Sequence, residues 1–142
     1  AQAERYTQTF ALLYVDLDHF KAVNDNFGHA AGDQLLVETA RRLEQAVRES
    51  DTVARLGGDE FAVILTQVQG QSEVEDVARR IVDDLASPFK LDAGIAHVSG
   101  SIGIAIWPNG GQDTDTLTHN ADLALYEAKA NGRSTYRVHN PL

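Results

Sequence analysis

Apolar residues along the chain occur in blocks whose spacing alternates between that of strands and that of helices. The continuous apolar run Phe10–Val15 is typical of a strand buried on both faces. Ser72, with Glu75 three residues on, forms a capping-box pattern, so Ser72 is the expected N-cap of a helix. In chain order we expect a strand at 10–15, helices at 19–26 and 30–48, strands at 51–56 and 61–65, a helix after Ser72 that ends before Pro88, strands at 89–91 and 96–107, a helix at 115–130 and a strand at 134–138.

The order of these elements, β-α-α-β-β-α-β-β-α-β, predicts an α+β fold. Without the extra helix and the short first strand of the small hairpin it begins with β-α-β-β-α-β, the ferredoxin-like arrangement around a central antiparallel sheet. In that topology the first strand lies beside the strands of the central hairpin, so Asp16 faces the turn at Gly57–Glu60. The carboxylates of Asp16, Asp59 and Glu60 are therefore expected to converge, and hard divalent cations prefer such oxygen ligands.

Length and composition narrow the class of protein. At 142 residues and 43% hydrophobic, the chain is large enough for one globular domain with its own core. The absence of cysteine excludes a disulfide scaffold and a thiolate metal site, and it fits a reducing compartment. The sequence contains neither an apolar run long enough to span a bilayer nor a signal-peptide pattern. Because it also lacks methionine, we expect a piece of a longer protein, with the polar stretch Ala1–Gln8 as the tail of an upstream helix.

The charge balance argues against a general nucleic-acid binder. Twenty-one acidic residues against 12 basic residues give a net charge of −9, whereas nucleic-acid binding requires a basic surface. A nucleotide substrate is compatible with this charge, because divalent cations can bridge acidic side chains and a polyphosphate. Most of the acidic residues are expected to be solvated surface residues.

Gly57-Gly58-Asp59-Glu60 stands between the two strands of the expected hairpin. Glycine tolerates positive φ and lacks a Cβ atom, so the backbone of this turn can come very close to a ligand. The two acids that follow would hold a cation beside a bound phosphate. Taken alone, the four residues fit equally well with a surface turn that carries two solvated carboxylates.

Further motifs accompany this turn along the chain. They are Asp16–Lys21, Asn24, Phe27–Asp33, Arg55–Phe61 around the turn itself, Ser101–Ala105, Ala121–Lys129 and Gly132-Arg133. In type, order and spacing this set resembles GGDEF domains, the diguanylate cyclases, and the resemblance covers nearly the whole of 1–142 as a single domain. Two departures exist. The Asp-x-Leu-Thr-Gly-Leu segment that normally precedes the first strand is absent, and Leu56 replaces a tyrosine.

The resemblance implies an enzyme that condenses two GTP into cyclic di-GMP and releases two pyrophosphates. It implies two divalent ions per active site, Mg²⁺ or Mn²⁺, which activate a hydroxyl and stabilise the leaving charge. By the same resemblance, Asp16 and Glu60 hold these ions with the main-chain carbonyl of Leu17. Asp59 is either a further ligand or the group that helps to deprotonate the 3′-hydroxyl. The pair Gly57-Gly58 leaves room for the phosphates and the ribose.

The resemblance also assigns the nucleotide contacts. Asn24 and Asp33 match the guanine-binding positions, and a carboxylate accepts both the N1–H and the N2–H donors that adenine does not offer together. The alternative for Asp33 is a helix cap. Lys21, Lys129 and Arg133 match the phosphate-contacting residues. The alternative for Lys129 and Arg133 is a favourable position near a helix C-terminus.

A regulatory site is implied by Arg48-Glu-Ser-Asp51, which ends six residues before Gly57. Many diguanylate cyclases carry an Arg-x-x-Asp site for inhibition by their product at this spacing, and the guanidinium of an arginine suits guanine and phosphate. Arg79 stands where a secondary arginine contact is sometimes found. The alternative for Arg48 and Asp51 is a solvated helix end.

The implied partners are GTP, cyclic di-GMP and a second copy of the chain, because each copy presents one GTP. We expect attached sensor or receiver domains, with phosphodiesterase domains in some proteins, and a cytoplasmic domain without direct membrane contact or nucleic acid. One competing hypothesis is a non-catalytic GGDEF module that binds GTP or cyclic di-GMP. Another is a nucleotidyl cyclase or polymerase palm of a different family, which has a similar fold but lacks the match at Asn24 and Asp33.

Overall fold

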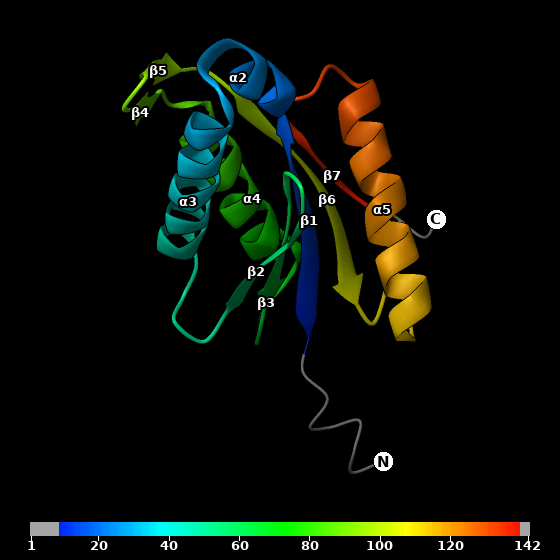
Figure 1. Cartoon of the computed structure of the whole chain (residues 1–142). Coiled ribbons are helices and arrows are strands. Elements are labelled where there is room, and N and C mark those ends of the chain that lie inside the picture. The colour runs from blue at the N-terminus through cyan, green and yellow to red at the C-terminus, as the bar shows by residue number, and fades with distance from the viewer. Residues whose placement is uncertain (1–8, 140–142) are drawn as a thin grey trace, which may run out of the picture.

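A five-stranded sheet forms the centre of the computed structural model, which describes residues 9–139 (Figure 1). Its strands lie in the order β2-β3-β1-β6-β7, and the neighbouring strands are antiparallel except for the parallel pair β6 and β7. A separate small sheet pairs β4 with β5. The first four strands of the central order have the predicted ferredoxin-like arrangement, with β7 added at one edge, so the α+β prediction is confirmed.

The elements are β1 (Phe10–Asp18), α2 (Phe20–Phe27), α3 (His29–Ala46), β2 (Thr52–Gly57), β3 (Glu60–Leu65), α4 (Gln71–Ala86), β4 (Phe89–Leu91), β5 (Gly94–Ala96), β6 (Ser99–Trp107), α5 (Thr114–Ala130) and β7 (Tyr136–Val138).

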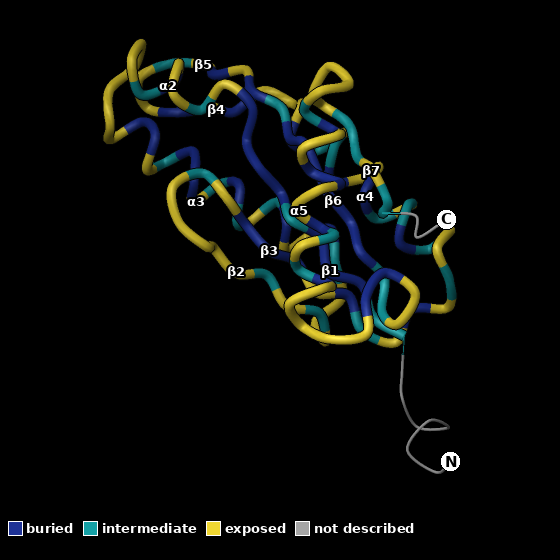
Figure 2. Tube along the Cα trace, turned by 90° about the vertical axis from the view of Figure 1, so that its right-hand side faces the viewer, coloured by how far each residue is buried: buried dark blue, intermediate teal, exposed yellow. Residues whose placement is uncertain are grey.

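Helices cover both faces of the central sheet. α2, α3 and α4 share a core with one face, which includes Leu13 and Val15 of β1. α5 packs on the other face, where Leu117 and Ala121 contact Leu12 of β1. β1 is therefore buried on both faces, as its continuous apolar run predicts, and Figure 2 shows it as a largely buried trace through the middle of the molecule.

Two strand boundaries differ from the prediction by three residues, and the others agree within two residues. β1 extends three residues beyond position 15, because Asp16–Asp18 continue to pair with β6 as far as Ser99. The predicted strand at 96–107 is divided: β5 pairs with β4, and β6 begins at Ser99. In both cases the backbone pairing, which apolar periodicity does not report, decides where the strand begins or ends.

The predicted N-cap at Ser72 is wrong. α4 begins at Gln71, two residues earlier than a cap at Ser72 implies, with Gly70 at the N-cap position and Ser72 inside the first turn. Glu73 occupies the third helical position, where a capping box places its acidic residue. Its side chain accepts a hydrogen bond from the Gln69 N–H at 2.7 Å, one residue before the N-cap, and the N-cap Gly70 has no side chain to complete a capping box.

α5 packs directly onto the backbone of β6. A Cβ atom at Gly103 would lie only 2.2 Å from the Ala121 carbonyl oxygen and 2.2 Å from the Leu125 nitrogen. Glycine is therefore required for this close approach. α5 ends at Ala130, and the N–H of its C-cap Asn131 donates to the Glu127 carbonyl.

Arg42 links α3 to the end of α4. Its guanidinium donates to the carbonyls of Asp84, Ser87 and Pro88 at 2.7, 2.9 and 2.7 Å, and it lies 3.7 Å from the centroid of the Phe89 ring. We expect Arg42→Ala to lower the free energy of unfolding by about 2–4 kcal/mol, because it leaves these C-terminal carbonyls unpaired and removes the cation–π contact. Urea unfolding measures this loss.

Arg41→Ala is the matched control for this prediction. Arg41 is the adjacent arginine of α3 and pairs with Glu38 on the exposed side of the helix. Its replacement is expected to leave the free energy of unfolding nearly unchanged, since exposed ion pairs contribute little. Equal losses from both variants would contradict a capping role for Arg42.

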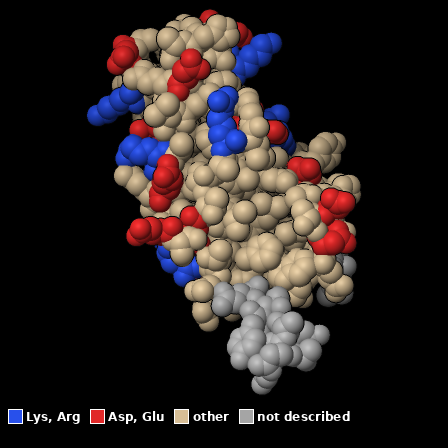
Figure 3. All heavy atoms as spheres, turned by 60° about the horizontal axis from the view of Figure 1, so that its bottom comes forward, with Lys and Arg blue, Asp and Glu red and all other residues tan. Residues whose placement is uncertain are grey.

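Charged side chains are spread over the surface rather than gathered by sign. On the face shown in Figure 3, acidic and basic side chains are interspersed around a broad neutral area. Some form short pairs along a helix, such as Arg79 with Asp76 at 2.8 Å. This surface agrees with the prediction that most of the acids are solvated.

The predicted helical tail at Ala1–Gln8 lies outside the residues that the structure describes. Between residues 9 and 139, none of the helices combines the length and the hydropathy that crossing a bilayer would need.

Candidate active site

The ends of β1 and β3 bring the predicted acidic residues together. Asp16 on β1 is directly opposite Glu60 on β3 and Ser101 on β6. The Leu17 N–H then donates to the Asp59 carbonyl at 3.2 Å. The expected approach of the first strand to the glycine turn is therefore present.

Asp16 is buried beside a cation. Only 6% of the surface of Asp16 is exposed, and its Oδ2 atom accepts a hydrogen bond from the Lys129 ammonium of α5. The other oxygen, Oδ1, is also buried and has no hydrogen-bond partner among the described residues. A buried carboxylate oxygen without a partner is energetically costly, and a divalent cation would satisfy it. The oxygen donors at this position thus fit a Mg²⁺ or Mn²⁺ ion.

The acidic side chains of the described residues do not form a complete coordination site for a cation. Within residues 9–139, no three His, Asp or Glu side chains form a group that could hold a metal ion. Glu60 is exposed, and burial together with the nearby Asp16 carboxylate raises the pKa of Asp59. Carboxylates without a cation between them repel one another. The backbone therefore brings these three acids to one end of the sheet, where Asp59 lies close to Asp16 and Glu60 stays exposed to solvent.

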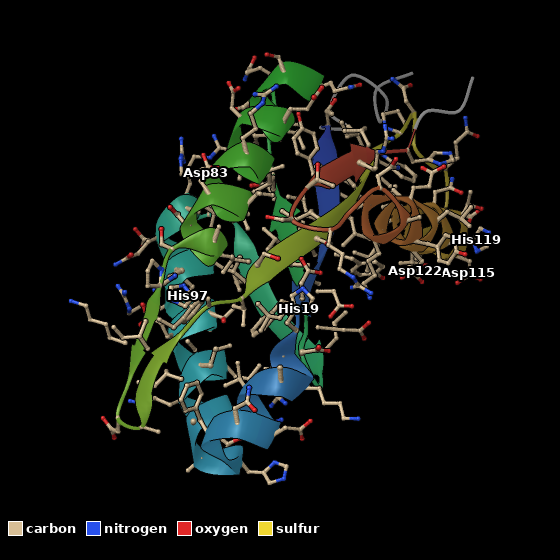
Figure 4. The ribbon with its side chains drawn as sticks, turned by 90° about the horizontal axis from the view of Figure 1, so that it is seen from above. His19, Asp83, His97, Asp115, His119 and Asp122 are labelled. Carbon is tan, nitrogen blue, oxygen red and sulfur yellow. The ribbon has the colours of Figure 1, made fainter. Side chains whose placement is uncertain are left out.

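The described histidines do not gather into an alternative centre. Figure 4 shows His19, His97 and His119 on separate parts of the molecule, at the end of β1, between β5 and β6, and on α5. A pocket of about 1040 Å³ lies at the opposite end of the sheet, between Thr9 and His139, and none of the three acids at the end of β1 lines it. The end of β1 is thus the candidate site.

The Gly57-Gly58 turn is open on its outer side. The two residues have φ values of 149° and 52°, and a Cβ atom added at either would meet nothing within 4 Å. Arg55 holds the turn from behind, since its guanidinium donates to the Gly58 carbonyl at 3.1 and 2.8 Å. The positive φ values require glycine, and the free space leaves the backbone accessible to a ligand.

Asn24 and Asp33 lie on helices α2 and α3, which contact each other. Gly32 permits this contact, because a Cβ atom there would lie 1.8 Å from the Asn24 Oδ1 atom. Asp33 follows Gly32 and is exposed. Since α3 begins at His29 with Gly28 at its N-cap, the alternative reading of Asp33 as a helix cap is wrong. Its carboxylate is free of that role.

The predicted phosphate-binding cations approach the site from two directions. Lys21 is exposed on α2, immediately beyond the end of β1. Lys129, in the last turn of α5, contacts Asp16, and Arg133 in the following loop lies 3.4 Å from the Asp18 carboxylate. A helix C-terminus favours basic residues, but both of these side chains also reach the carboxylates of β1.

Arg48 and Asp51 line a separate pocket of about 330 Å³ between α3 and α4. The Asp51 side chain is 2% exposed, and its oxygens accept hydrogen bonds from the Arg48 and Thr66 N–H groups at 2.9 and 3.0 Å. The Arg48 side chain is 54% exposed. The accessible member of the predicted product site is therefore Arg48.

Arg79 does not line this pocket. Its guanidinium pairs with Asp76 and Glu75 on the surface of α4 and lies 5.8 Å from the centroid of the Tyr136 ring. The arginine of α4 that lines the pocket is Arg80, which also donates to the Ala46 carbonyl at 2.9 Å.

Two residues that support the site received no role from the sequence. Arg55 fixes the glycine turn through its hydrogen bonds to Gly58, and the three-residue spacing between them is the only sequence feature that indicates this contact. Asp18 is a buried carboxylate that accepts hydrogen bonds from the Ser99 and Ser101 hydroxyls of β6. Its two-residue spacing from Asp16 indicates that both acids share one face of the strand.

The fold and the site together define a domain that presents carboxylates and an open glycine turn at one end of a ferredoxin-like sheet. The family model described as "Diguanylate cyclase, GGDEF domain" matches residues 1–135. The chain belongs to the GGDEF domain family.

Three curated relatives illustrate the breadth of this family. All three are from Pseudomonas aeruginosa. The bifunctional diguanylate cyclase/cyclic di-GMP phosphodiesterase MucR is 45% identical over 135 residues, with 95% of this chain and 20% of MucR aligned. The diguanylate cyclase TpbB is 41% identical over 137 residues, which are 96% of this chain and 32% of TpbB. The cyclic di-GMP phosphodiesterase NbdA is 40% identical over 124 residues, which are 87% of this chain and 16% of NbdA. The chain thus spans a third or less of the length of each relative.

Solved structures share the whole fold. The crystal structure of the GGDEF domain of TpbB superposes with a TM-score of 0.92 at 39% identity, covering 99% of this chain and 88% of that one. The GGDEF domain of DgcB from Caulobacter crescentus, solved in complex with c-di-GMP, gives a TM-score of 0.86 at 29% identity, covering 97% and 82%.

Proposed function

We propose that this domain is a diguanylate cyclase, which condenses two GTP into cyclic di-GMP with release of two pyrophosphates. The observation that carries the proposal is the buried Asp16 carboxylate, opposite Glu60 and beside the open Gly57-Gly58 turn. Membership of the GGDEF family and the intact signature support the same activity. The proposed domain comprises residues 1–142.

In the proposed reaction each 3′-hydroxyl attacks the α-phosphorus of the other nucleotide. A P–O bond forms, the bond from that phosphorus to the bridging oxygen of the β-phosphate breaks, the hydroxyl proton is released and pyrophosphate departs. The same exchange at the second hydroxyl closes the ring. Because both steps are in-line displacements at phosphorus, the protein contributes mainly positioning and charge stabilisation.

The acidic end of the sheet would hold the cations that this chemistry uses. We assign Asp16 and Glu60 as ligands of two Mg²⁺ or Mn²⁺ ions, with the Leu17 carbonyl. Such ions, when bound, supply Lewis-acid stabilisation of the developing negative charge. Asp59, whose pKa is raised by burial and by Asp16, is a further ligand or the group that accepts the hydroxyl proton.

The remaining polar residues would orient the nucleotide. Asn24 and Asp33, on adjoining helices, are assigned to the guanine edge. Lys21, Lys129 and Arg133 are assigned to the phosphates, and the contact of Lys129 with Asp16 supports its place at the metal end of the site. Each chain then presents one complete GTP, and the second reactant belongs to another copy.

The dependence on a second copy gives the test of the proposal. With GTP and Mg²⁺ present, we expect the turnover per chain to rise with protein concentration, because active dimers form from inactive monomers. The measurement is the initial rate of cyclic di-GMP formation over a wide dilution series. GTP binding, measured by calorimetry on the same samples, should not follow this dependence.

Two outcomes would contradict the proposal in different ways. A turnover per chain that is independent of concentration would contradict the requirement for a dimer. GTP binding without any cyclic di-GMP at the highest concentrations would contradict the cyclase activity of this domain.

We further propose that cyclic di-GMP inhibits the domain by binding at Arg48-x-x-Asp51. The exposed Arg48 guanidinium lies at the mouth of the pocket between α3 and α4, where it can reach guanine and phosphate. Arg79 does not line this pocket, but it pairs with Asp76, which does, so we assign Arg79 a secondary contact to the same ligand.

Arg48→Ala is expected to weaken the binding of cyclic di-GMP by about tenfold or more, because it removes charge-assisted hydrogen bonds. Calorimetry with cyclic di-GMP measures the affinity, and Arg41→Ala, an exposed arginine of α3, is the control for the loss of charge. Equal affinities of the Arg48→Ala variant and the wild type would exclude this site.

A non-catalytic module that binds GTP or cyclic di-GMP is the second candidate function. It is favoured by the alignment with NbdA, a protein named for cyclic di-GMP phosphodiesterase activity. The intact Gly57–Glu60 signature favours the cyclase instead. Nucleotide binding without turnover at every protein concentration would identify the binding module.

The domain is proposed to work within a longer protein, since the aligned region is only 20% of MucR and 32% of TpbB. Sensor, receiver or phosphodiesterase domains attached to it would then control how often two copies meet. We place this activity in the cytoplasm, where GTP is available.

A further inference from the structure

Asp18 is a buried carboxylate that the proposed reaction leaves without a role. Its side chain is 0% exposed, and it lies on the same face of β1 as Asp16. The Ser99 and Ser101 hydroxyls of β6 donate to its two oxygens, Oδ2 at 2.6 Å and Oδ1 at 2.9 Å, and the Ser101 hydroxyl also lies 3.1 Å from Oδ2. A charge buried this deeply persists only when it is well paired, so its other partners are informative.

These other partners come from the loop that joins α5 to β7. The Ser134 N–H donates to Oδ2 of Asp18 at 3.0 Å, and the Arg133 guanidinium lies 3.4 Å from Oδ1. Arg133 and Ser134 have φ values of 65° and 49°, a conformation that residues with a side chain adopt at an energetic cost. Asp18 therefore compensates for an unfavourable backbone at both residues.

This loop continues the segment that carries two of the proposed phosphate-binding cations. Lys129 contacts Asp16 just before the loop, and Arg133 contacts Asp18 within it. Neighbouring carboxylates of one strand thus fix both ends of the segment. We infer that Asp18 is a positioning residue, which holds the loop at residues 131–135 so that Lys129 and Arg133 face the triphosphate. It does so without touching the nucleotide itself, and the inference rests on the proposed GTP site.

A purely structural role would look different. If Asp18 only joined β1 to β6, the serine contacts would suffice and the loop would be independent of the carboxylate. Both carboxylate oxygens face donors from the loop as well as from the serines. In an Asp18→Asn variant, the amide NH₂ group must therefore meet a donor whichever way it is turned. The variant keeps the shape of the side chain and disrupts its contacts with the loop.

The experiment combines amide hydrogen exchange with nucleotide binding. In Asp18→Asn without nucleotide, we expect exchange at residues 131–135 to be about tenfold faster or more, with exchange in β1 and β6 nearly unchanged. The affinity for guanosine 5′-[α,β-methylene]triphosphate, which cannot release pyrophosphate, should fall about tenfold, with little further loss when the substitution is added to Arg133→Ala. Ser99→Ala, which removes a hydrogen bond on the β6 side only, is the control and should leave loop exchange and affinity nearly unchanged.

The outcomes separate the possibilities. Unchanged exchange in the loop, or equal acceleration throughout β1, β6 and the loop, would overturn the inference. If the wild type does not bind the GTP analogue, the proposed function fails, while loop exchange still decides whether Asp18 holds the loop. If Asp18→Asn does not fold, Arg133→Ala removes the ion pair from the exposed side, and a loop that then exchanges no faster would overturn the inference.

Discussion

Replacing Glu60 by glutamine is expected to lower the rate of cyclic di-GMP formation about 10³-fold, because the amide cannot supply the negative charge that holds a divalent ion. Glu60 is exposed at the start of β3, directly opposite the buried Asp16. The substitution preserves the shape of the side chain at an exposed position, so the free energy of unfolding should change by less than about 0.5 kcal/mol. The assay compares the two proteins at a concentration where the wild type is fully active.

Metal binding provides a second measurement for this variant. Glu60→Gln should weaken the binding of Mn²⁺, followed by electron paramagnetic resonance, in parallel with the loss of turnover. Glu127→Gln, at an exposed position of α5, is the matched control and should retain both properties. Full turnover by the Glu60→Gln protein would exclude the assignment of Glu60 as a metal ligand.

Removing the carboxylate of Asp33 should abolish the preference for guanine. The wild type is expected to bind GTP about 10–100-fold more tightly than ITP, whose base lacks the N2 amino group that this carboxylate would accept from. In Asp33→Ala the two affinities should become nearly equal, because GTP loses the contact that distinguishes it. Calorimetry with each nucleotide measures the ratio.

Asp25→Ala is the control for this second prediction, since it removes the same charge from an exposed position of α2 beside Asn24. It should leave the ratio of the two affinities unchanged. A preserved preference for GTP in Asp33→Ala would assign guanine recognition to other residues.

The features of the site that depend on topology could be predicted from the sequence. The order of elements placed the first strand beside the hairpin, and the pairing of Asp16 with Glu60 follows directly from it. The glycine turn and the burial of β1 could also be predicted. Paired glycines indicate a turn with positive φ values, and a continuous apolar run indicates a strand that is buried on both faces.

The features that depend on contacts between distant side chains could not be predicted. The sequence indicates that three carboxylates approach one another, but not that Lys129 already pairs with Asp16 while Glu60 stays exposed. It also does not reveal that Asp51 turns inward to two backbone N–H groups and leaves Arg48 exposed. Such outcomes depend on burial and on which donor is nearest, and neither has a local signature.

Helix starts were uncertain for a related reason. Ser72 has a side chain suited to an N-cap, but Gly70 occupies that position in α4 and no side chain caps it. Asp33 also has a side chain suited to an N-cap, whereas α3 starts at His29, five residues earlier than a cap at Asp33 would imply.

The contact of α5 with Gly103 limits how this domain can be controlled. The backbone of α5 lies directly on the backbone of β6 there, and no side chain separates the two elements. The same helix carries Lys129, which contacts Asp16 on the strand next to β6. If the reaction needs two copies, as we propose, a signal from elsewhere in the protein would act mainly on how these two copies are oriented toward each other.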